Sequence, residues 1–285
     1  MPLITAIFDL PRMTPYVPKF AQQSAIWNIP SEEVIGIEVE AENVQHVSGL
    51  NDVWQVTEDG SLRNSGREFI THPVAAKFAP NALENLLNNR SFCFSPRTSV
   101  HVHLNCMDIA NNQVIDILLL YCLYEKALFR FVGKGRQKNI YCVPITECNL
   151  LANIERFGVK APWEKYTALN LLPLREHGTI EFRHMHGTTD VRKLSIWIDL
   201  ITRLKEYVKA HSSDEIRRAI NAFTEADIGR LSNDIWGDVA GQLEISDPDE
   251  VISRVPVVKL AMCKTQVVNT QASATVSDKS KYFQI

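Results

Sequence analysis

The chain contains 285 residues, 45% of them hydrophobic, which is enough for a substantial core in one large domain or two modest ones. The 30 basic residues nearly balance the 33 acidic ones, and the formal net charge is -3. This balance argues against nucleic acid or a membrane surface as the main partner.

The cysteines and the N-terminus indicate a cellular compartment. The six cysteines form no CxxC pair, which is typical of free thiols in a reducing compartment. The first residues lack a basic segment and are interrupted by prolines, so we expect no signal peptide. The longest apolar run, residues 114–124, is too short to cross a bilayer and contains Asp116. We therefore predict a cytoplasmic protein.

The first clear element is a strand that carries two acidic residues. Residues 1–33 contain several prolines and predict an irregular lead-in. The run VIGIEVEAE, residues 34–42, then predicts a strand. Alternation places Glu38 and Glu40 on one face, about 7 Å apart, because each residue of a strand rises about 3.3 Å. Carboxylates at this spacing repel one another unless a cation compensates them.

Further strands and one short helix are expected up to residue 105. Residues 53–74 predict two strands around a turn, because Asp59-Gly60 and Ser65-Gly66 are turn residues. Residues 81–89 predict a short helix. Residues 99–105, SVHVHLN, alternate strictly and place His101 and His103 on one face of a strand.

The second half is predicted to be mainly helical. Helical spacing runs from residue 108 or 112 to 131 and ends at Gly133, before the basic loop GKGRQK. Residues 165–174 and 179–186 predict a hairpin-like pair of strands. Helices are expected at 190–212 and from Ser212 onward, where Glu215 completes a capping box. One domain, residues 34–262, and a flexible tail at 263–285 fit this pattern.

Three of the predicted strands share one design, with apolar side chains on one face and ionisable ones on the other. A solvated sheet face would also be polar, but such faces favour Thr, Lys, Ser and Gln of mixed sign. The opposed sets are Ile35, Ile37 and Val39 with Glu38 and Glu40; Val100, Val102 and Leu104 with His101 and His103; and Ile180 and Phe182 with Thr179, Glu181 and Arg183.

This residue chemistry is that of a hard cation. Several carboxylates with one or two imidazoles and no thiolate suit Mg²⁺ or Mn²⁺ better than structural zinc. Such ions bridge nucleotide phosphates, and arginines assist them. Arg183 is expected on the same face as Glu181, where it would bind a phosphate oxygen. Lys134 and Arg136 of the basic loop are further phosphate candidates, although a lid or a simple solvated loop explains them equally well.

In order along the chain, five segments resemble the amidoligase family, a branch of carboxylate-amine ligases related to glutamine synthetase and glutamate-cysteine ligase and common in phages and bacteria. The segments are IGIEVE (35–40), DGSLRNSGREFITHPV (59–74), SVHVHLN (99–105), YEKALFRFVGKGR (124–136) and KYTALNLLPLREHGTIEFRHMHGT (165–188). The resemblance covers about residues 34–205. The predicted C-terminal helices occupy residues 190–262 and continue beyond this range. It implies an α+β fold whose antiparallel sheet has a concave polar face, with helices packed on the other face.

The resemblance also implies roles for individual residues. Glu38, His103 and Glu181 would hold the ion on the ATP phosphates, whereas Glu40 and Glu68, with Asp59, would hold an ion near the acceptor carboxylate. Glu40, Glu181 and Arg183 would be the catalytic residues. Arg183, Lys134, Arg136 and Arg130 would bind the nucleotide. His101 is expected to be a hydrogen-bonded support, and Glu125 to be buried against Arg130.

The implied reaction is ATP- and Mg²⁺-dependent formation of an amide through an acyl phosphate. Its partners would be ATP, a carboxylate and an amine, either small molecules or a peptide. Two alternatives stay open: phosphoryl transfer to a guanidino or amine nitrogen on the same fold, and a virion-associated binding protein whose site is vestigial. The sequence leaves the oligomeric state open, a homo-oligomer included.

Overall fold

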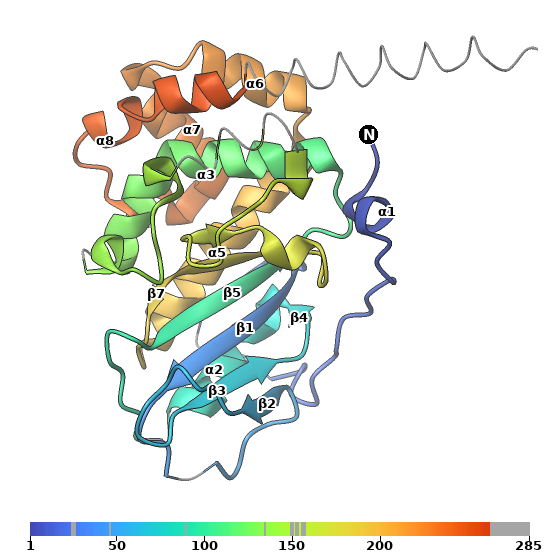
Figure 1. Ribbon diagram of the computed structural model, residues 1–285, viewed down its shortest axis with the longest axis vertical. Coiled ribbons are helices and arrows are strands. Elements are labelled where there is room, and N and C mark those ends of the chain that lie inside the picture. Colours follow the sequence, from blue (N-terminus) through green and yellow to red (C-terminus); the bar gives the residue numbers. More distant parts are fainter. Residues whose placement is uncertain are drawn as a thin grey trace, which may run out of the picture.

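An open antiparallel sheet organises the fold in the computed structural model, which describes residues 1–23, 27–45, 47–88, 90–133, 135–148, 151, 154 and 158–262. The strands lie in the order β2-β3-β1-β5-β7-β6, and β4 pairs with β1 (Figure 1). Their bounds are β1 Val34–Ala41, β2 Trp54–Thr57, β3 Arg67–Thr71, β4 Val74–Ala75, β5 Ser99–Asn105, β6 Leu169–Asn170 and β7 Thr179–His186.

The register of the sheet brings the ionisable residues together. Paired residues of antiparallel strands project from the same face. Glu38 of β1 lies opposite His101 of β5, and Glu40 lies opposite Glu68 of β3. Glu181 of β7 lies opposite His103. One face therefore collects polar groups from four adjacent strands, and the alternating positions, such as Ile37 opposite Val102, are left for the core.

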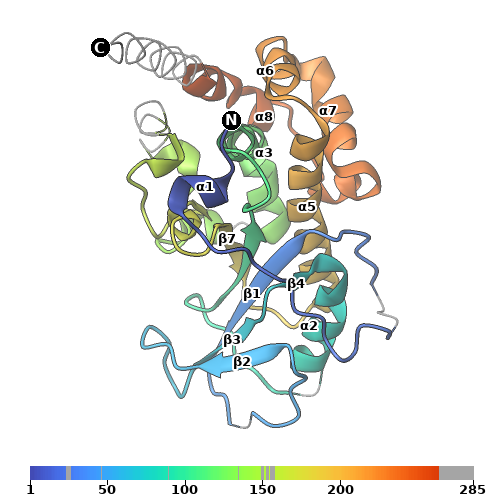
Figure 2. The same ribbon diagram turned by 90° about the vertical axis from the view of Figure 1, so that its right-hand side faces the viewer.

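Helices cover the apolar face. Phe182 of β7 contacts Tyr121 of α3 and Trp197 of α5, and all three side chains are almost fully buried. Burying each such side chain contributes about 2–3 kcal/mol to folding. In Figure 2, α2 and α5 lie on one side of the sheet and α1 on the other. The helices are α1 Ile4–Phe8, α2 Ala79–Leu87, α3 Asn111–Val132, α5 Val191–Ala210, α6 Ser213–Asn221, α7 Ile228–Trp236 and α8 Asp249–Ile252.

Most of the expected elements are present. The strand at 34–42 is β1, the paired strands within 53–74 are β2 and β3, and the helices at 81–89 and 190–212 are α2 and α5 within two residues. The capping box of Ser212 and Glu215 is confirmed. The lead-in is not wholly irregular, because residues 4–8 form α1, and the tail at 263–285 lies outside the described residues. In the described part of the chain, no helix has the length and apolar character needed to cross a membrane.

A buried lysine joins the sheet to α5. Lys205 is fully buried, and its Nζ contacts Glu33, just before β1, and Asp108, just after β5, the latter at 2.6 Å. Lys209, one turn later, contacts the same two carboxylates at 2.7 and 3.0 Å but is 40% exposed. A buried charge is tolerated only when it is paired in this way.

We expect Lys205→Ala to lower the free energy of unfolding by about 3 kcal/mol, because it leaves two carboxylates partly buried beside an apolar gap. Lys209→Ala removes the same charge from a more exposed position and should change the free energy of unfolding by less than about 1 kcal/mol. Urea denaturation of both variants measures the difference. Equal effects would contradict the assignment of Lys205 as the buried member of the cluster.

Candidate functional site

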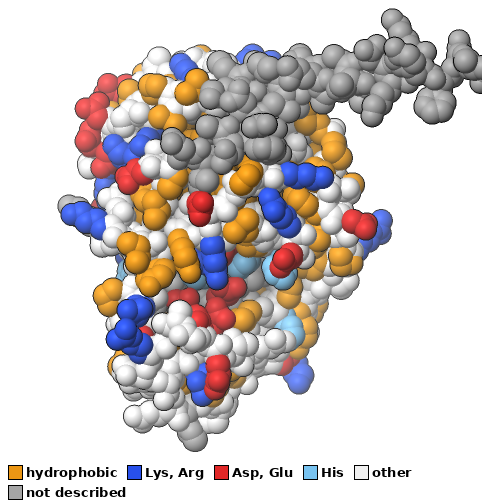
Figure 3. All heavy atoms as spheres, in the orientation of Figure 1, with side chains coloured by type: hydrophobic (Ala, Val, Ile, Leu, Met, Phe, Trp, Pro, Cys, Tyr) orange, Lys and Arg blue, Asp and Glu red, His pale blue; other side chains and the backbone are white. Residues whose placement is uncertain are grey.

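Two groups of three titratable side chains lie on the open face of the sheet. Glu38, His101 and Glu181 form the first triad, and their ligand atoms lie within 4.8 Å of one another. Glu40, Asp59 and Glu68 form the second triad by the same measure. Figure 3 shows acidic side chains gathered near the centre of this face, with basic ones around them.

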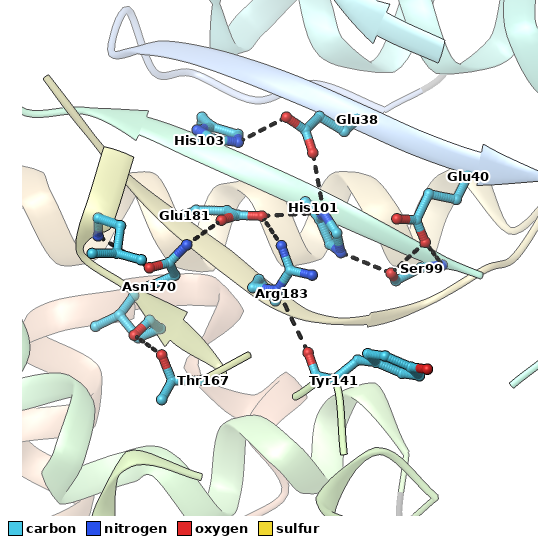
Figure 4. A network of polar contacts seen from close by, with 12 residues as sticks. Glu38, Glu40, Ser99, His101, His103, Tyr141, Thr167, Asn170, Glu181 and Arg183 are labelled. Atoms are coloured by element: carbon cyan, nitrogen blue, oxygen red, sulfur yellow. Dashed lines mark hydrogen bonds and ion pairs between the residues drawn. The ribbon is translucent and has the colours of Figure 1, made fainter. Parts of the chain in front are cut away.

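The first triad spans three neighbouring strands and is centred on an imidazole (Figure 4). His101 Nδ1 lies 3.1 Å from Glu38 Oε2 and 3.2 Å from Glu181 Oε1. Its Nε2 lies 2.7 Å from Ser99 Oγ. Burial lowers the pKa of His101, but the contacts with Glu181 and Glu38 outweigh it and raise this pKa to about 9. The protonated His101 therefore lies between two carboxylates, at a position that would also suit a metal cation.

The carboxylates of this triad are held ionised. Burial favours the neutral acid, but hydrogen bonds from His101 and His103 keep the pKa of Glu38 far below its usual range. Burial also opposes ionisation of Glu181, yet His101 and Arg183 lower its pKa to about 2. Asn170 Nδ2 donates to Glu181 Oε2 at 2.7 Å, which fixes the carboxylate from the β6 side. Two ionised carboxylates and one imidazole form a donor set that fits a divalent ion once His101 gives up its proton.

The second triad consists of three carboxylates. Glu40 Oε2 accepts hydrogen bonds from Ser99 N at 2.8 Å and Ser99 Oγ at 2.7 Å, and Thr57 Oγ1 donates to Glu68 at 3.2 Å. None of the ion pairs among the described residues involves Glu40, Asp59 or Glu68. Burial and the charges of Glu38 and Glu40 raise the pKa of Glu68 to about 7. Three carboxylates with this repulsion fit a hard cation such as Mg²⁺.

A β-bulge lies at Arg183, beside the first triad. Val100 pairs with Met185 and Val102 with Phe182, so one residue of β5 lies opposite two residues of β7, Arg183 and His184. Bulges of this kind re-aim side chains near active sites. Arg183 contacts Glu181 through Nη1, and its Nε donates to Tyr141 O at 3.5 Å. The guanidinium thus lies at the border of the two triads.

Arg136 binds the backbone at the bulge. Its Nε donates to His184 O at 2.7 Å and its Nη2 to Arg183 O at 2.8 Å, and the side chain is buried. These bonds satisfy two carbonyls at the bulge. Two of its donors are therefore used on the backbone, and Arg136 lines neither cavity beside the triads, so its binding of phosphate stays a prediction.

Other sequence-based expectations also differ from the structure. Arg130 pairs with Glu250 and donates to Glu244 O, and it lines neither of the cavities beside the triads, so it is not placed to bind a nucleotide there. Glu125 is buried as expected, but Tyr121 and the backbone N–H groups of Ile145 and Thr146 bind it in place of Arg130. Lys134 lies outside the described residues.

The predicted metal ligands converge, with one exchange of roles. Glu38, Glu40, Asp59, Glu68 and Glu181 all belong to the triads. His103 lies outside them: its Nε2 is 3.0 Å from Glu38 Oε1, and its Nδ1 is 3.0 Å from Thr179 Oγ1. His101 takes the central position. The pairing of Glu38 with His101 decides this, and the alternation of the sequence alone does not reveal the pairing.

Two cavities of unlike character flank the first triad. A polar cavity of about 150 Å³ lies over the second triad and is also lined by Arg97, Ser99, Tyr141, Lys165, Tyr166 and Arg183. A mainly apolar cavity of about 550 Å³ lies beside Glu38 and His103 and is lined by Pro11, Met13, Ile37, Ile70 and Met107, among others. Glu38 lines the apolar cavity and His101 lines the polar one, so the first triad lies between a small polar space and a large apolar one.

Neither a protein-family model nor a curated protein matches the chain. The conclusions below therefore depend on the residues of the site and their geometry.

We expect Glu68→Gln to stabilise the metal-free protein above neutral pH. A carboxyl whose pKa rises from 4.5 unfolded to about 7 folded destabilises the fold progressively as pH rises through this window, and the full penalty applies above it. In EDTA the variant should melt above the wild type at pH 8 and at the same temperature near pH 4. With Mg²⁺ at pH 8 the variant should melt below the wild type, because the substitution removes a carboxylate that would bind the ion.

Thermal melts at both pH values, with and without Mg²⁺, test this expectation. Glu58→Gln is the matched control, because that side chain is 83% exposed and lies outside both triads. A Glu68→Gln protein that melts below the wild type in EDTA at pH 8 would show that charge repulsion is not the main energetic effect of Glu68.

Proposed function

We propose that the protein is an ATP- and Mg²⁺-dependent carboxylate-amine ligase that forms an amide through an acyl phosphate. The observation that carries the proposal is the pair of adjacent triads, each suited to a divalent ion, with the Arg183 guanidinium at their border. The order of motifs that resembles the amidoligase family supports the same activity. Mn²⁺ would fit the same donor set.

The two cavities divide the substrates by size and polarity. The apolar cavity of about 550 Å³ has the volume and lining typical of a site for a nucleoside. The polar cavity of about 150 Å³ suits only a small, polar acid. Phosphates that extend from the first cavity would pass Glu38 and reach the border of the triads. The γ-phosphorus and the acceptor carboxylate would then meet beside Arg183.

The residues of the chain would act mainly through charge and position. The acceptor carboxylate attacks the γ-phosphorus, ADP leaves, and an amine then displaces phosphate from the acyl phosphate. Ions bound at the triads would neutralise the phosphate oxygens and lower the repulsion between the two anions. Arg183 is held by Glu181 and by the bulge, so it would bind the transferred phosphoryl group without prior reorganisation. Tyr141 and Tyr166 line the cavity and would limit the access of water to the acyl phosphate.

The geometry favours this activity over a vestigial site. In a binding protein that had lost the activity, Glu38, Glu68 and His103 would be free to point apart. Here Glu38 and His103 are in contact, and Glu68 belongs to the second triad. Phosphoryl transfer to a guanidino nitrogen would use the same metal sites, so it is distinguished by its products.

Calorimetric titration with Mn²⁺ and a non-hydrolysable ATP analogue tests the proposal. We expect one nucleotide per chain for the wild type, and a loss of at least about tenfold in affinity for Glu181→Gln and Glu40→Gln, because each removes a charged ligand. The Glu250→Gln variant should bind as the wild type does, because Glu250 belongs to neither triad and lines neither cavity.

Product analysis then separates the reaction classes. A ligase gives ADP, free phosphate and an amide, whereas a guanidino kinase gives ADP and a phosphorylated guanidine without free phosphate. Absence of nucleotide binding by the folded wild type in the presence of Mn²⁺ would overturn the proposal.

A further inference from the structure

A further cavity, separate from the two beside the triads, is lined by basic side chains. Its volume is about 330 Å³, and it shares no lining residue with the polar cavity or the apolar cavity. Arg136, His186 and Lys193 supply its ionisable groups, and no aspartate or glutamate is among the described residues that line it. This basic cavity therefore contains positive charge that no carboxylate of its lining balances.

The three basic residues of this cavity come from three different elements. His186 ends β7, Lys193 lies in the first turn of α5, and Arg136 begins the short 3₁₀ helix Arg136–Lys138. None of the three takes part in an ion pair among the described residues. The fold thus brings basic groups together at one place and does not neutralise them there.

Two of these side chains have donors that a ligand could use. His186 Nδ1 donates to Val132 O at 2.9 Å, so Nε2 is the ring nitrogen available to a ligand. Lys193 Nζ lies 5.8 Å from the centroid of the Phe131 ring, a cation–π contact that uses none of its N–H groups. Arg136 is buried and binds two carbonyls, so it contributes mainly a fixed charge.

The charges around His186 favour an anion in the cavity. Burial and the charges of Lys193 and Arg136 lower the pKa of this imidazole, and the hydrogen bond to Val132 offsets only part of the effect. An anion bound beside these groups would reverse the effect of both cations. A phosphate dianion balances two positive charges, whereas a carboxylate balances one.

We propose that the basic cavity binds the phosphate group of a small phosphorylated molecule. Lys193 Nζ and His186 Nε2 would donate to the phosphate oxygens, and Arg136 would add a charge that water screens little. The volume exceeds that of a phosphate ion and is typical of small-molecule sites, and Ser95 and Asn139 line the space left for the rest of the ligand. None of these residues belongs to a triad, so the site would be independent of the ligase function.

Calorimetric titration in EDTA tests the proposal, because without a divalent ion the carboxylates of the triads repel phosphate. Glycerol 3-phosphate, inorganic phosphate and glycerol are compared at pH 7 and constant ionic strength. We expect one site per chain, with glycerol 3-phosphate bound at least as tightly as inorganic phosphate and glycerol not bound. Lys193→Gln should lower the affinity at least about tenfold, and His186→Gln at least about threefold, because the imidazole must first take up a proton.

An NMR titration then locates the ligand. The Nε2 signal of His186 in ¹⁵N-labelled protein, assigned by its loss in His186→Gln, should shift as glycerol 3-phosphate is added. Arg218→Gln removes an exposed positive charge on α6 and is the matched control, with an expected change in affinity of less than about twofold. Arg136 is left unchanged, because its substitution would remove the contacts at the bulge. Circular dichroism confirms that the variants are folded.

Three results would overturn the proposal. The first is no binding of either phosphate by the folded wild type. The second is loss of affinity in Arg97→Gln with Lys193→Gln unchanged, because Arg97 lines the polar cavity and the phosphate would then lie there. The third is binding of inorganic phosphate without binding of the glycerol ester, which would exclude a phosphorylated molecule as the ligand. Because these titrations contain neither a divalent ion nor a nucleotide, none of the three results bears on the ligase function.

Discussion

Repulsion between like charges on one face of a β-sheet is the constraint around which this structure is organised. Strand alternation and antiparallel register leave Glu38, Glu40, Glu68 and Glu181 no freedom to separate, because turning one of them away would also expose its apolar neighbours. The fold meets the repulsion in two ways. In the first triad a protonated imidazole lies between the carboxylates, and in the second the excess charge is relieved by a raised pKa at Glu68. Such a difference between neighbouring groups is typical of functional sites.

The fixed geometry of the site depends on polar groups behind the sheet. Arg136 binds the carbonyls at the bulge, and Glu125 binds the backbone of the segment that follows Tyr141. Both side chains are buried, and both belong to α3 or the segment directly after it. A buried polar network with satisfied partners makes one arrangement more stable than its alternatives. The helix that covers the apolar face thereby also positions Arg183 and Tyr141 on the other face.

Local patterns in the sequence were sufficient to predict the strands, the long helices and the polar face. Glu38 and Glu40 alternate with Ile37 and Val39, and the pairing of β1 with β3 and β5 keeps the two glutamates on one face, although Glu40 is buried. The sequence analysis assigned the ligand role to His103 and a supporting role to His101, but both lie on one face and only the register with β1, which pairs Glu38 with His101, separates them. Arg136 lies in a basic loop, and such a loop has the same composition whether its guanidinium groups bind phosphate or backbone carbonyls. Arg130 lies in α3, where it pairs with Glu250. The β-bulge, whose carbonyls bind Arg136, is not visible in the pattern of apolar residues.

The bulge also constrains how β7 can change in length. Between Phe182 and Met185 this strand has one residue more than β5 needs, so deleting either intervening residue would give a regular ladder. The shorter strand would be more regular, but Arg136 would lose one of the two carbonyls that it binds. The extra residue of this strand therefore provides a hydrogen-bond acceptor for the buried Arg136, and its deletion would be expected to lower stability.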